Sequence, residues 1–250
     1  MLLAAPAARA DSHTDFQEAS ARLEALMDKA TPQSGLPRLG DPEVAQLFAH
    51  IADRPRLFQA PVAALQDMNQ SVAVCEQVMR LGKTYYAFGL SWPLPLSGAE
   101  LLQARKDQMT RNLANYGDEM STLFAFSMHC HGHLIALMEQ EFSAQPADAV
   151  SGPERLRARA FSKGSTTLYA GVVQFVQGPS WNEAQKKLML EAAAQHATAN
   201  ANLMAPPLRE RLLTSLADAD KDLDPALAPA LATIRQALAV TTCTGLCQYY

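Results

Sequence analysis

The chain has 250 residues, of which 48% are hydrophobic and 18% charged, with a formal net charge of −4. Such a chain can bury a core without a metal or a dense set of disulfides. Acidic and basic residues are mixed along it without a broad basic face, which excludes nucleic acid as an expected partner. No apolar run approaches the roughly 20 residues that cross a bilayer, so we expect no transmembrane segment.

The first ten residues indicate the end of an export signal. Residues 2–7 are apolar, and Ala-Arg-Ala at 8–10 has the small-x-small pattern of a signal-peptidase site. We therefore expect residues 1–10 to be the remnant of a signal and the mature chain to begin at Asp11. This places the protein in the periplasm or outside the cell. The alternative is an Ala-rich, disordered terminus on a cytoplasmic protein.

Capping residues and helical periodicity predict an all-α chain. The capping box, Ser or Thr followed three residues later by Glu or Gln, marks expected helix starts. These pairs are Thr14 with Gln17, Ser97 with Glu100, Ser151 with Glu154 and Ser180 with Glu183, and Asp-Pro pairs at 41–42 and 224–225 mark two more starts. We expect about eight to nine helices, chosen from ten candidate ranges of which 83–90 is the weakest: 14–30, 42–52, 61–81, 83–90, 98–116, 119–144, 153–177, 181–203, 207–218 and 225–241.

These helices predict one multi-helix bundle that occupies residues 11–250 as a single domain. The ranges 98–116 and 119–144 would form a long central hairpin turned at Gly117. Glycine costs a helix interior about 1 kcal/mol relative to alanine. Gly164, inside the expected helix 153–177, therefore indicates a close approach by a neighbouring helix, and the alternative is that it admits a flat ligand.

The stretch SMHCHGHL, residues 127–134, places three histidines at alternate positions around Cys130. On a helical wheel His131 lies in the apolar arc with Cys130, whereas His129 and His133 share the polar side. A continuous helix therefore separates His131 from the other two imidazoles. We expect His131 to be a core histidine whose nitrogens bond to neighbours, with a catalytic base in a helical enzyme as the alternative.

His129 and His133 are four residues apart, the one-turn spacing at which two imidazoles can bind one zinc or copper ion. A carboxylate or His196 would have to complete such a site. The pair lacks the intervening glutamate of zinc hydrolases, because Cys130, His131 and Gly132 stand between. We expect two solvent-facing histidines and no cofactor, with zinc or copper binding as the alternative.

Four cysteines predict two disulfides if the protein is exported. They are Cys75, Cys130, Cys243 and Cys247. Cys75 and Cys130 both lie on apolar helical stripes, which favours a bond between them and leaves Cys243 to pair with Cys247. Crossed pairs that join the tail to the core are the alternative.

No phosphate loop, nucleophile elbow or paired zinc cysteines occur in the sequence, so we expect no enzyme. Trp92, Leu94 and Leu96 lie between prolines in a loop, where they cannot easily join the core, and they predict a protein-binding surface. The sequence thus favours a non-catalytic, periplasmic, helical protein that binds another protein, with an inhibitor of a secreted toxin in the bacterial envelope as one version. The alternative function is a metal-binding protein that uses His129 and His133.

Overall fold

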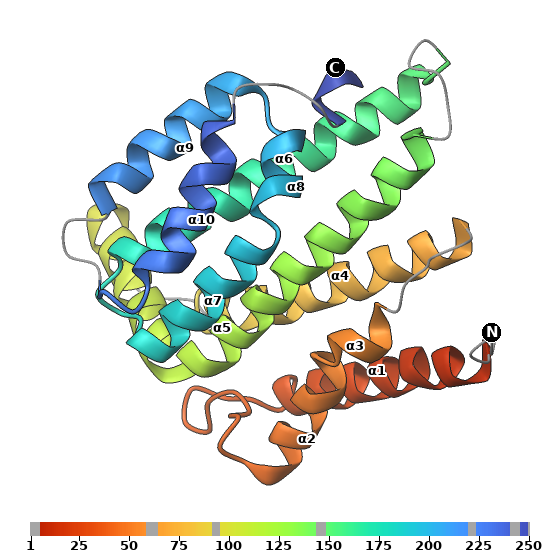
Figure 1. Cartoon of the computed structure of the whole chain (residues 1–250). Helices are drawn as coiled ribbons and strands as arrows, with labels where there is room; N and C mark the ends of the chain where they lie inside the picture. Colours follow the sequence, from red (N-terminus) through yellow and green to blue (C-terminus); the bar gives the residue numbers. More distant parts are fainter. Residues whose placement is uncertain are drawn as a thin grey trace. The chain divides into compact units, whose positions relative to one another are not determined.

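The computed structural model describes residues 6–58, 65–91, 96–143, 149–219, 224–240 and 246–249. These residues form the helices α1 to α10 and one short 3₁₀ helix, η2, and they contain no strand (Figure 1). The predicted all-α class is therefore confirmed. None of the helices described is long and apolar enough to cross a membrane.

The chain divides into two compact units, residues 1–126 and residues 127–250. The boundary lies inside α5 (Gly98–Ser143), so this helix contributes to both units. Each unit has buried aliphatic and aromatic side chains of its own. The candidate sites below each lie within one unit.

The first unit contains α1 (Pro6–Met27), α2 (Pro42–Ile51), α3 (Arg54–Leu57), α4 (Leu65–Ala87) and the first part of α5. α1 packs against α2, α3 and α4. The core of the unit includes Phe16, Leu23, Val44, Phe48, Ile51, Val78, Leu81 and Leu123.

Two expected boundaries in this unit are wrong. α1 is already helical at Pro6, so Thr14 and Gln17 lie inside the helix instead of capping it. α4 runs through Gly82 without a break, whereas the sequence predicted two helices, 61–81 and 83–90. Gly82 lies inside this helix and packs against α5, since a Cβ there would lie 3.8 Å from that of Leu123, an ordinary contact distance.

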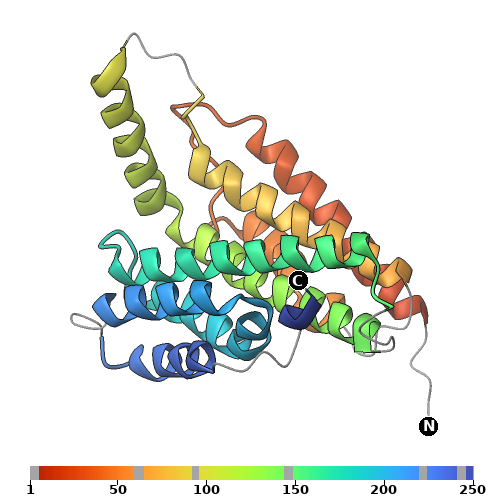
Figure 2. The ribbon, with the colours of Figure 1, turned by 90° about the horizontal axis from the view of Figure 1, so that it is seen from above.

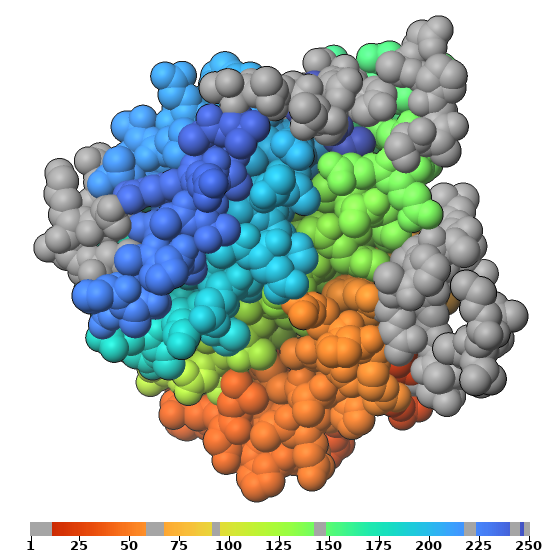
Figure 3. All heavy atoms as spheres, in the orientation of Figure 1, coloured from red at the N-terminus to blue at the C-terminus, as the bar shows by residue number. Residues whose placement is uncertain are grey.

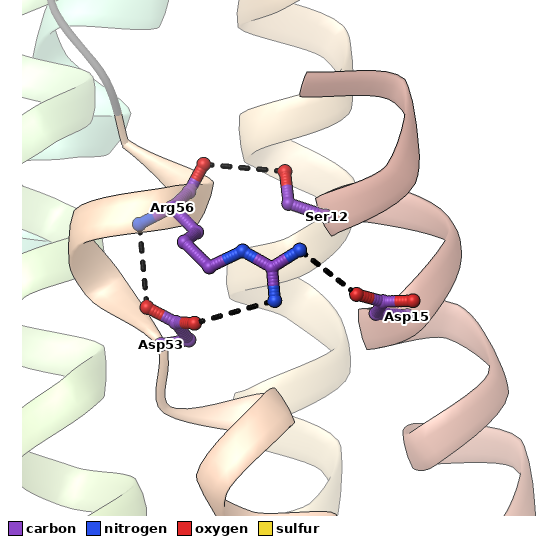
Figure 4. Close-up of polar contacts among 4 residues, drawn as sticks. All are labelled: Ser12, Asp15, Asp53 and Arg56. Atoms are coloured by element: carbon purple, nitrogen blue, oxygen red, sulfur yellow. Dashed lines mark hydrogen bonds and ion pairs between the residues drawn. The ribbon is translucent and has the colours of Figure 1, made fainter. Parts of the chain in front are cut away.

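Polar contacts join α3 to α1 (Figure 4). Asp53 caps α3 by accepting a hydrogen bond from the Arg56 backbone N–H at 3.3 Å. The Arg56 guanidinium lies 3.0 Å from the Asp15 carboxylate, and Ser12 donates to the Arg56 carbonyl at 3.2 Å. Both partners of the Arg56–Asp15 pair are substantially exposed, so we expect it to contribute at most about 1 kcal/mol.

α5 keeps helical dihedral angles along its length except at Tyr116, where φ is −126° and ψ is 24°. Figure 2 shows the ribbon of α5 bending between its olive first part and its green remainder. The two long helices predicted at 98–116 and 119–144 are therefore the two parts of α5, joined by a kink at Tyr116. We call residues 98–111 the arm.

The second unit contains the last part of α5 with α6 (Gly152–Gln177), α7 (Glu183–Gln195), α8 (Ala197–Leu203), α9 (Pro206–Ala219), α10 (Ala228–Ala239) and η2 (Leu246–Tyr249). α6 packs against α7, α8, α9 and η2, so it is the central helix of this unit. α9 and α10 form much of the surface on the face that Figure 3 draws.

The helix starts of this unit are partly as predicted. Ser151 and Glu154 form the expected capping box at α6. α7 begins instead at Asn182, whose side chain pairs with Gln185 in a capping box, and not at Ser180. α10 begins after Leu227, since Asp224 is used in the preceding turn, where it accepts from the Ala226 N–H at 2.7 Å.

Candidate functional sites

The histidine stretch lies on the regular part of α5, with no kink at Gly132. The imidazoles therefore diverge as the wheel predicts. His131 contacts α6, whereas His129 contacts His196, the residue between α7 and α8. All of these contacts lie within the second unit.

His131 is bonded and packed on several sides by α6. Its Nε2 lies 2.7 Å from Oγ of Ser165, and its ring stacks on Phe161 with centroids 5.4 Å apart. Gly164 leaves room for the ring, because a Cβ there would lie 3.1 Å from Cε1 of His131. Burial lowers the pKa of His131 to about 4, against the smaller opposing effect of a backbone hydrogen bond with Phe161, so the ring is neutral at physiological pH. The prediction of a satisfied histidine is confirmed.

The contact between Ser165 and His131 has the separation of a catalytic nucleophile and its base. However, Ser165 has no exposed surface. The group that bonds to His131 besides Ser165 is a backbone carbonyl of α6, where a catalytic pair commonly has a carboxylate. The arrangement thus resembles core packing more closely than a hydrolytic site.

His129 forms a direct contact with His196. Nδ1 of His129 lies 2.9 Å from Nε2 of His196, and the two ring planes are inclined at 77° with centroids 5.1 Å apart. His196 ends α7 and begins α8, with a φ of −110° and a ψ of 10°. Gly132 makes this possible, because a Cβ there would lie 2.1 Å from Nδ1 of His196. His129 and His133 are both partly buried, so the expectation of two solvent-facing histidines is wrong.

The geometry of this pair suits a shared proton. The centroid separation is close to the nitrogen separation plus the two ring radii, so the facing nitrogens lie near the line that joins the ring centres. A zinc ion between facing nitrogens would need them about 4 Å apart, given bonds of about 2.0–2.1 Å. Within the described residues, no three His, Cys, Asp or Glu side chains are grouped to hold a metal. Metal binding by His129 and His133 stays a prediction, and an ion on Nδ1 of His129 would have to displace His196.

The cysteines that the structure describes are all oxidised. Cys75 and Cys130 are both disulfide-bonded, as expected for the predicted pair, and Cys247 is disulfide-bonded as well. Cys243 lies outside the described residues, so its bond to Cys247 stays a prediction.

The expected protein-binding loop is described only in part. Trp92 and Leu94 lie outside the described residues, and Leu96, which is 39% exposed, stands two residues before α5. The arm follows immediately. None of residues 98–111 is buried, and Leu102 on the arm is 70% exposed.

Sequence reasoning missed two features of these sites. It treated 181–203 as one helix and therefore did not place His196 at a helix break, where neither proline nor glycine marks the end. It also overlooked Asn112, Tyr116 and Glu119, buried polar residues of α5 that recur every three or four positions and continue the apolar stripe of Leu123. This spacing of three or four residues is the sequence signal that could have identified them as a buried face.

No protein-family model, curated protein or solved structure matches this chain. Its function therefore has to be argued from its own residues.

Proposed function

We propose that the chain is a non-catalytic, exported helical protein that acts by binding another protein, and that the arm is its contact surface. The observation that carries this proposal is the exposure of the arm. None of residues 98–111 is buried, although the arm includes Leu101, Leu102 and Met109. Apolar side chains that a chain leaves accessible on one helix are typical of a surface that a partner covers.

The apolar side chains of the arm share one face. On a helical wheel Leu101, Leu102 and Met109 of the arm fall within one third of the circumference, as does Leu113 just beyond it. This is the pattern of an amphipathic helix that inserts into a hydrophobic groove of a partner. Leu102 is the most exposed of them and would be the central anchor.

The charged side chains of the arm indicate the rim of that groove. The arm carries three basic residues, Arg105, Lys106 and Arg111, against two acidic ones, Glu100 and Asp107. Asp107 already accepts a hydrogen bond from Gln103 at 2.7 Å. A partner groove edged by carboxylates would complement this distribution.

Two further observations support the proposal. Disulfides persist in oxidising compartments, so the bonded state of Cys75, Cys130 and Cys247 agrees with export to the periplasm. The burial of Ser165 beside His131 counts against the enzyme alternative. An inhibitor that neutralises a secreted toxin would be one protein of the proposed kind.

The test is affinity capture from an envelope extract of the source organism with wild-type, Leu102→Asp and Leu156→Asp proteins. Leu156 is 67% exposed on α6 and is the matched control for Leu102. We expect one protein to be recovered with the wild type and with Leu156→Asp. Recovery should fall at least about tenfold with Leu102→Asp, which corresponds to about 1.4 kcal/mol of binding energy.

Both variants should stay folded, since neither side chain is in a core, and circular dichroism checks this. Equal recovery with all three proteins would show that the arm is not the contact surface. Repeated failure to recover any specific protein with the wild type would contradict protein binding itself.

A further inference from the structure

Three polar side chains of α5 lie on one buried face just beyond the arm. Asn112, Tyr116 and Glu119 are spaced by four and three residues, so they follow one another along the helix. Their exposures are 1%, 3% and 3%. Buried polar groups need hydrogen-bond partners, and here each of the three side chains bonds to a backbone group of another segment of the first unit.

Asn112 bonds to the end of α4. Its side-chain amide donates to the carbonyls of Tyr86 at 2.9 Å and of Phe88 at 2.8 Å. The last carbonyls of a helix have no partner within the helix, and Asn112 supplies one. Gln108 donates to Oδ1 of Asn112 at 2.9 Å, which orients the amide for this role.

Tyr116 and Glu119 bond to the loop between α1 and α2. The Leu36 N–H donates to the Tyr116 hydroxyl at 2.9 Å, and the Leu39 N–H donates to Oε1 of Glu119 at 2.5 Å. Gly35 permits this approach because its φ is +71° and because a Cβ there would lie 2.8 Å from the Tyr116 hydroxyl. The loop is therefore shaped around the tyrosine.

Aromatic contacts reinforce these bonds around Tyr116. Its ring centroid lies 5.5 Å from that of Tyr85 and 6.1 Å from that of Phe88, both contributed from α4 and its C-terminal end. Arg38, from the same loop as Leu36, lies 5.5 Å over the ring. Tyr116 is thus held by α4 and by the loop at once.

Tyr116 is also the one residue of α5 with non-helical dihedral angles. Sharp bends in helices have identifiable causes, of which proline is the commonest, and α5 contains no proline. Gly117, which follows Tyr116, makes this position easy to bend, and the contacts just described are made at the same place. We propose that Asn112, Tyr116 and Glu119 form a clasp that fixes the direction of the arm, and that opening the clasp on either side lets the arm change direction.

The clasp would favour the proposed binding of a partner by the arm. A helix held in one direction loses less conformational freedom when a partner binds, so the clasp pre-organises the apolar face of the arm. In this respect the inference rests on the proposed function. The clasp itself is a property of the unbound protein and can be tested without a partner.

The test measures the direction of the arm by pulsed electron–electron double resonance between two nitroxide labels. The labels are attached to Gln103→Cys on the arm and Glu18→Cys on α1, both exposed positions of the first unit, in the full chain under non-reducing conditions. The described native cysteines are in disulfides and will not react. Asn112→Ala opens the α4 side of the clasp, and Tyr116→Phe removes only the hydroxyl on the loop side. Thr110→Ala is the control, since its hydroxyl donates only to Lys106 on the arm itself.

We expect one narrow distance distribution for the wild type and for Thr110→Ala, and loss of that single distance with Asn112→Ala and Tyr116→Phe. The result that would overturn the clasp is a distribution unchanged by both variants, or one broadened equally by Thr110→Ala. Tyr116→Phe is a small change that should leave the fold intact, so the test stands even where Asn112→Ala does not fold. A missing partner in the capture experiment would leave this result unaffected, which separates the two proposals.

Discussion

Buried or partly buried polar side chains lie along α5 at two places, and the kind of hydrogen-bond partner differs between the two. At the clasp, Asn112, Tyr116 and Glu119 bond to backbone groups of α4 and of a loop. In the histidine cluster, His129 and His131 bond to the side chains of His196 and Ser165. Backbone groups have fixed positions and do not titrate, whereas an imidazole can gain a proton as the pH falls.

The clasp sets geometry, because contacts to backbone groups are either made or broken, which suits the positioning of the arm. In the histidine cluster, His131 is neutral at physiological pH and gains a proton only near pH 4. Each place also contains one group whose pKa is shifted by burial, and the shifts run in opposite directions. Burial lowers the pKa of His131 to about 4 and raises the pKa of Glu119 from its usual 4.5.

The largest expected effect is acid destabilisation through His131. The unfolded chain protonates this histidine near pH 6.5, whereas the folded protein keeps it neutral until about pH 4. Its contribution to stability is therefore complete above pH 6.5 and is lost as the pH falls toward 4. The loss amounts to at most about 3 kcal/mol, since one pKa unit corresponds to about 1.36 kcal/mol and the ring keeps some contact with solvent.

Urea unfolding of the wild type and of His131→Gln at several pH values between 7 and 4 measures this effect. The free energy of unfolding should fall more steeply toward pH 4 in the wild type than in the variant, because glutamine does not titrate. His50→Gln, an exposed position on α2, is the control and should follow the wild type. Parallel curves for the wild type and His131→Gln would contradict a buried neutral ring.

The second expected effect concerns the fit of His196 over α5. A Cβ at Gly132 would lie 2.1 Å from Nδ1 of His196, so Gly132→Ala must expel the imidazole and break its contact with His129. We expect Gly132→Ala to destabilise the protein by about 1–3 kcal/mol, even though alanine favours the helix by about 1 kcal/mol.

Gly164→Ala is the matched control, because a Cβ there would lie 3.1 Å from His131 and needs a shift of only a few tenths of an ångström. We expect its stability to stay within about 1 kcal/mol of the wild type, since the helix gain offsets the tighter contact. Thermal and urea unfolding compare the two variants. Equal destabilisation would mean that His196 is not seated on Gly132.

These glycines show how far the sequence predicted the structure. Gly164 inside an expected helix correctly indicated a close approach, but not that an imidazole of α5 would make it. The capping box at Ser151 predicted its helix start because both partners are local. Ser180 and Glu183 fit the same local pattern, but the capping box of α7 is formed by Asn182 and Gln185. Local capping rules therefore do not choose between overlapping candidates.

The break at His196 could not be predicted, because it depends on a glycine of another helix. The sequence around it, AAAQHATAN, favours an uninterrupted helix. The contact with Gly132 and His129 comes from a segment more than sixty residues away. The clasp has the same origin, since Tyr116 and Glu119 bond to a loop 80 residues earlier in the chain. In both places the sequence predicts the helix, and tertiary contacts decide where it bends or stops.

The smallest expected effect is a pH dependence of stability at Glu119, opposite in sign to that at His131. The folded state raises the pKa of Glu119, mainly through burial, so the folded protein holds its proton to a higher pH than the unfolded chain does. The stability that depends on Glu119 is therefore present at acid pH and is lost as the pH rises above the usual value of 4.5. Glutamine keeps an oxygen that accepts from the Leu39 N–H and removes the charge. Glu119→Gln should consequently be more stable than the wild type at pH 7, with the difference closing as the pH falls toward 4.5.

Urea unfolding at pH 7, 5.5 and 4 checks this expectation, with Glu18→Gln, an exposed position on α1, as the control whose difference from the wild type should not change with pH. A Glu119→Gln protein that is less stable than the wild type at pH 7 would mean that the charged carboxylate is favoured at this site. The backbone hydrogen bond from Leu39 and the nearby Arg38, which both favour the charged form, would then outweigh the burial that opposes it. In that case a negative charge on Glu119 would stabilise the clasp. The clasp would then differ from the histidine cluster only in that its titrating group is an acid and not a base.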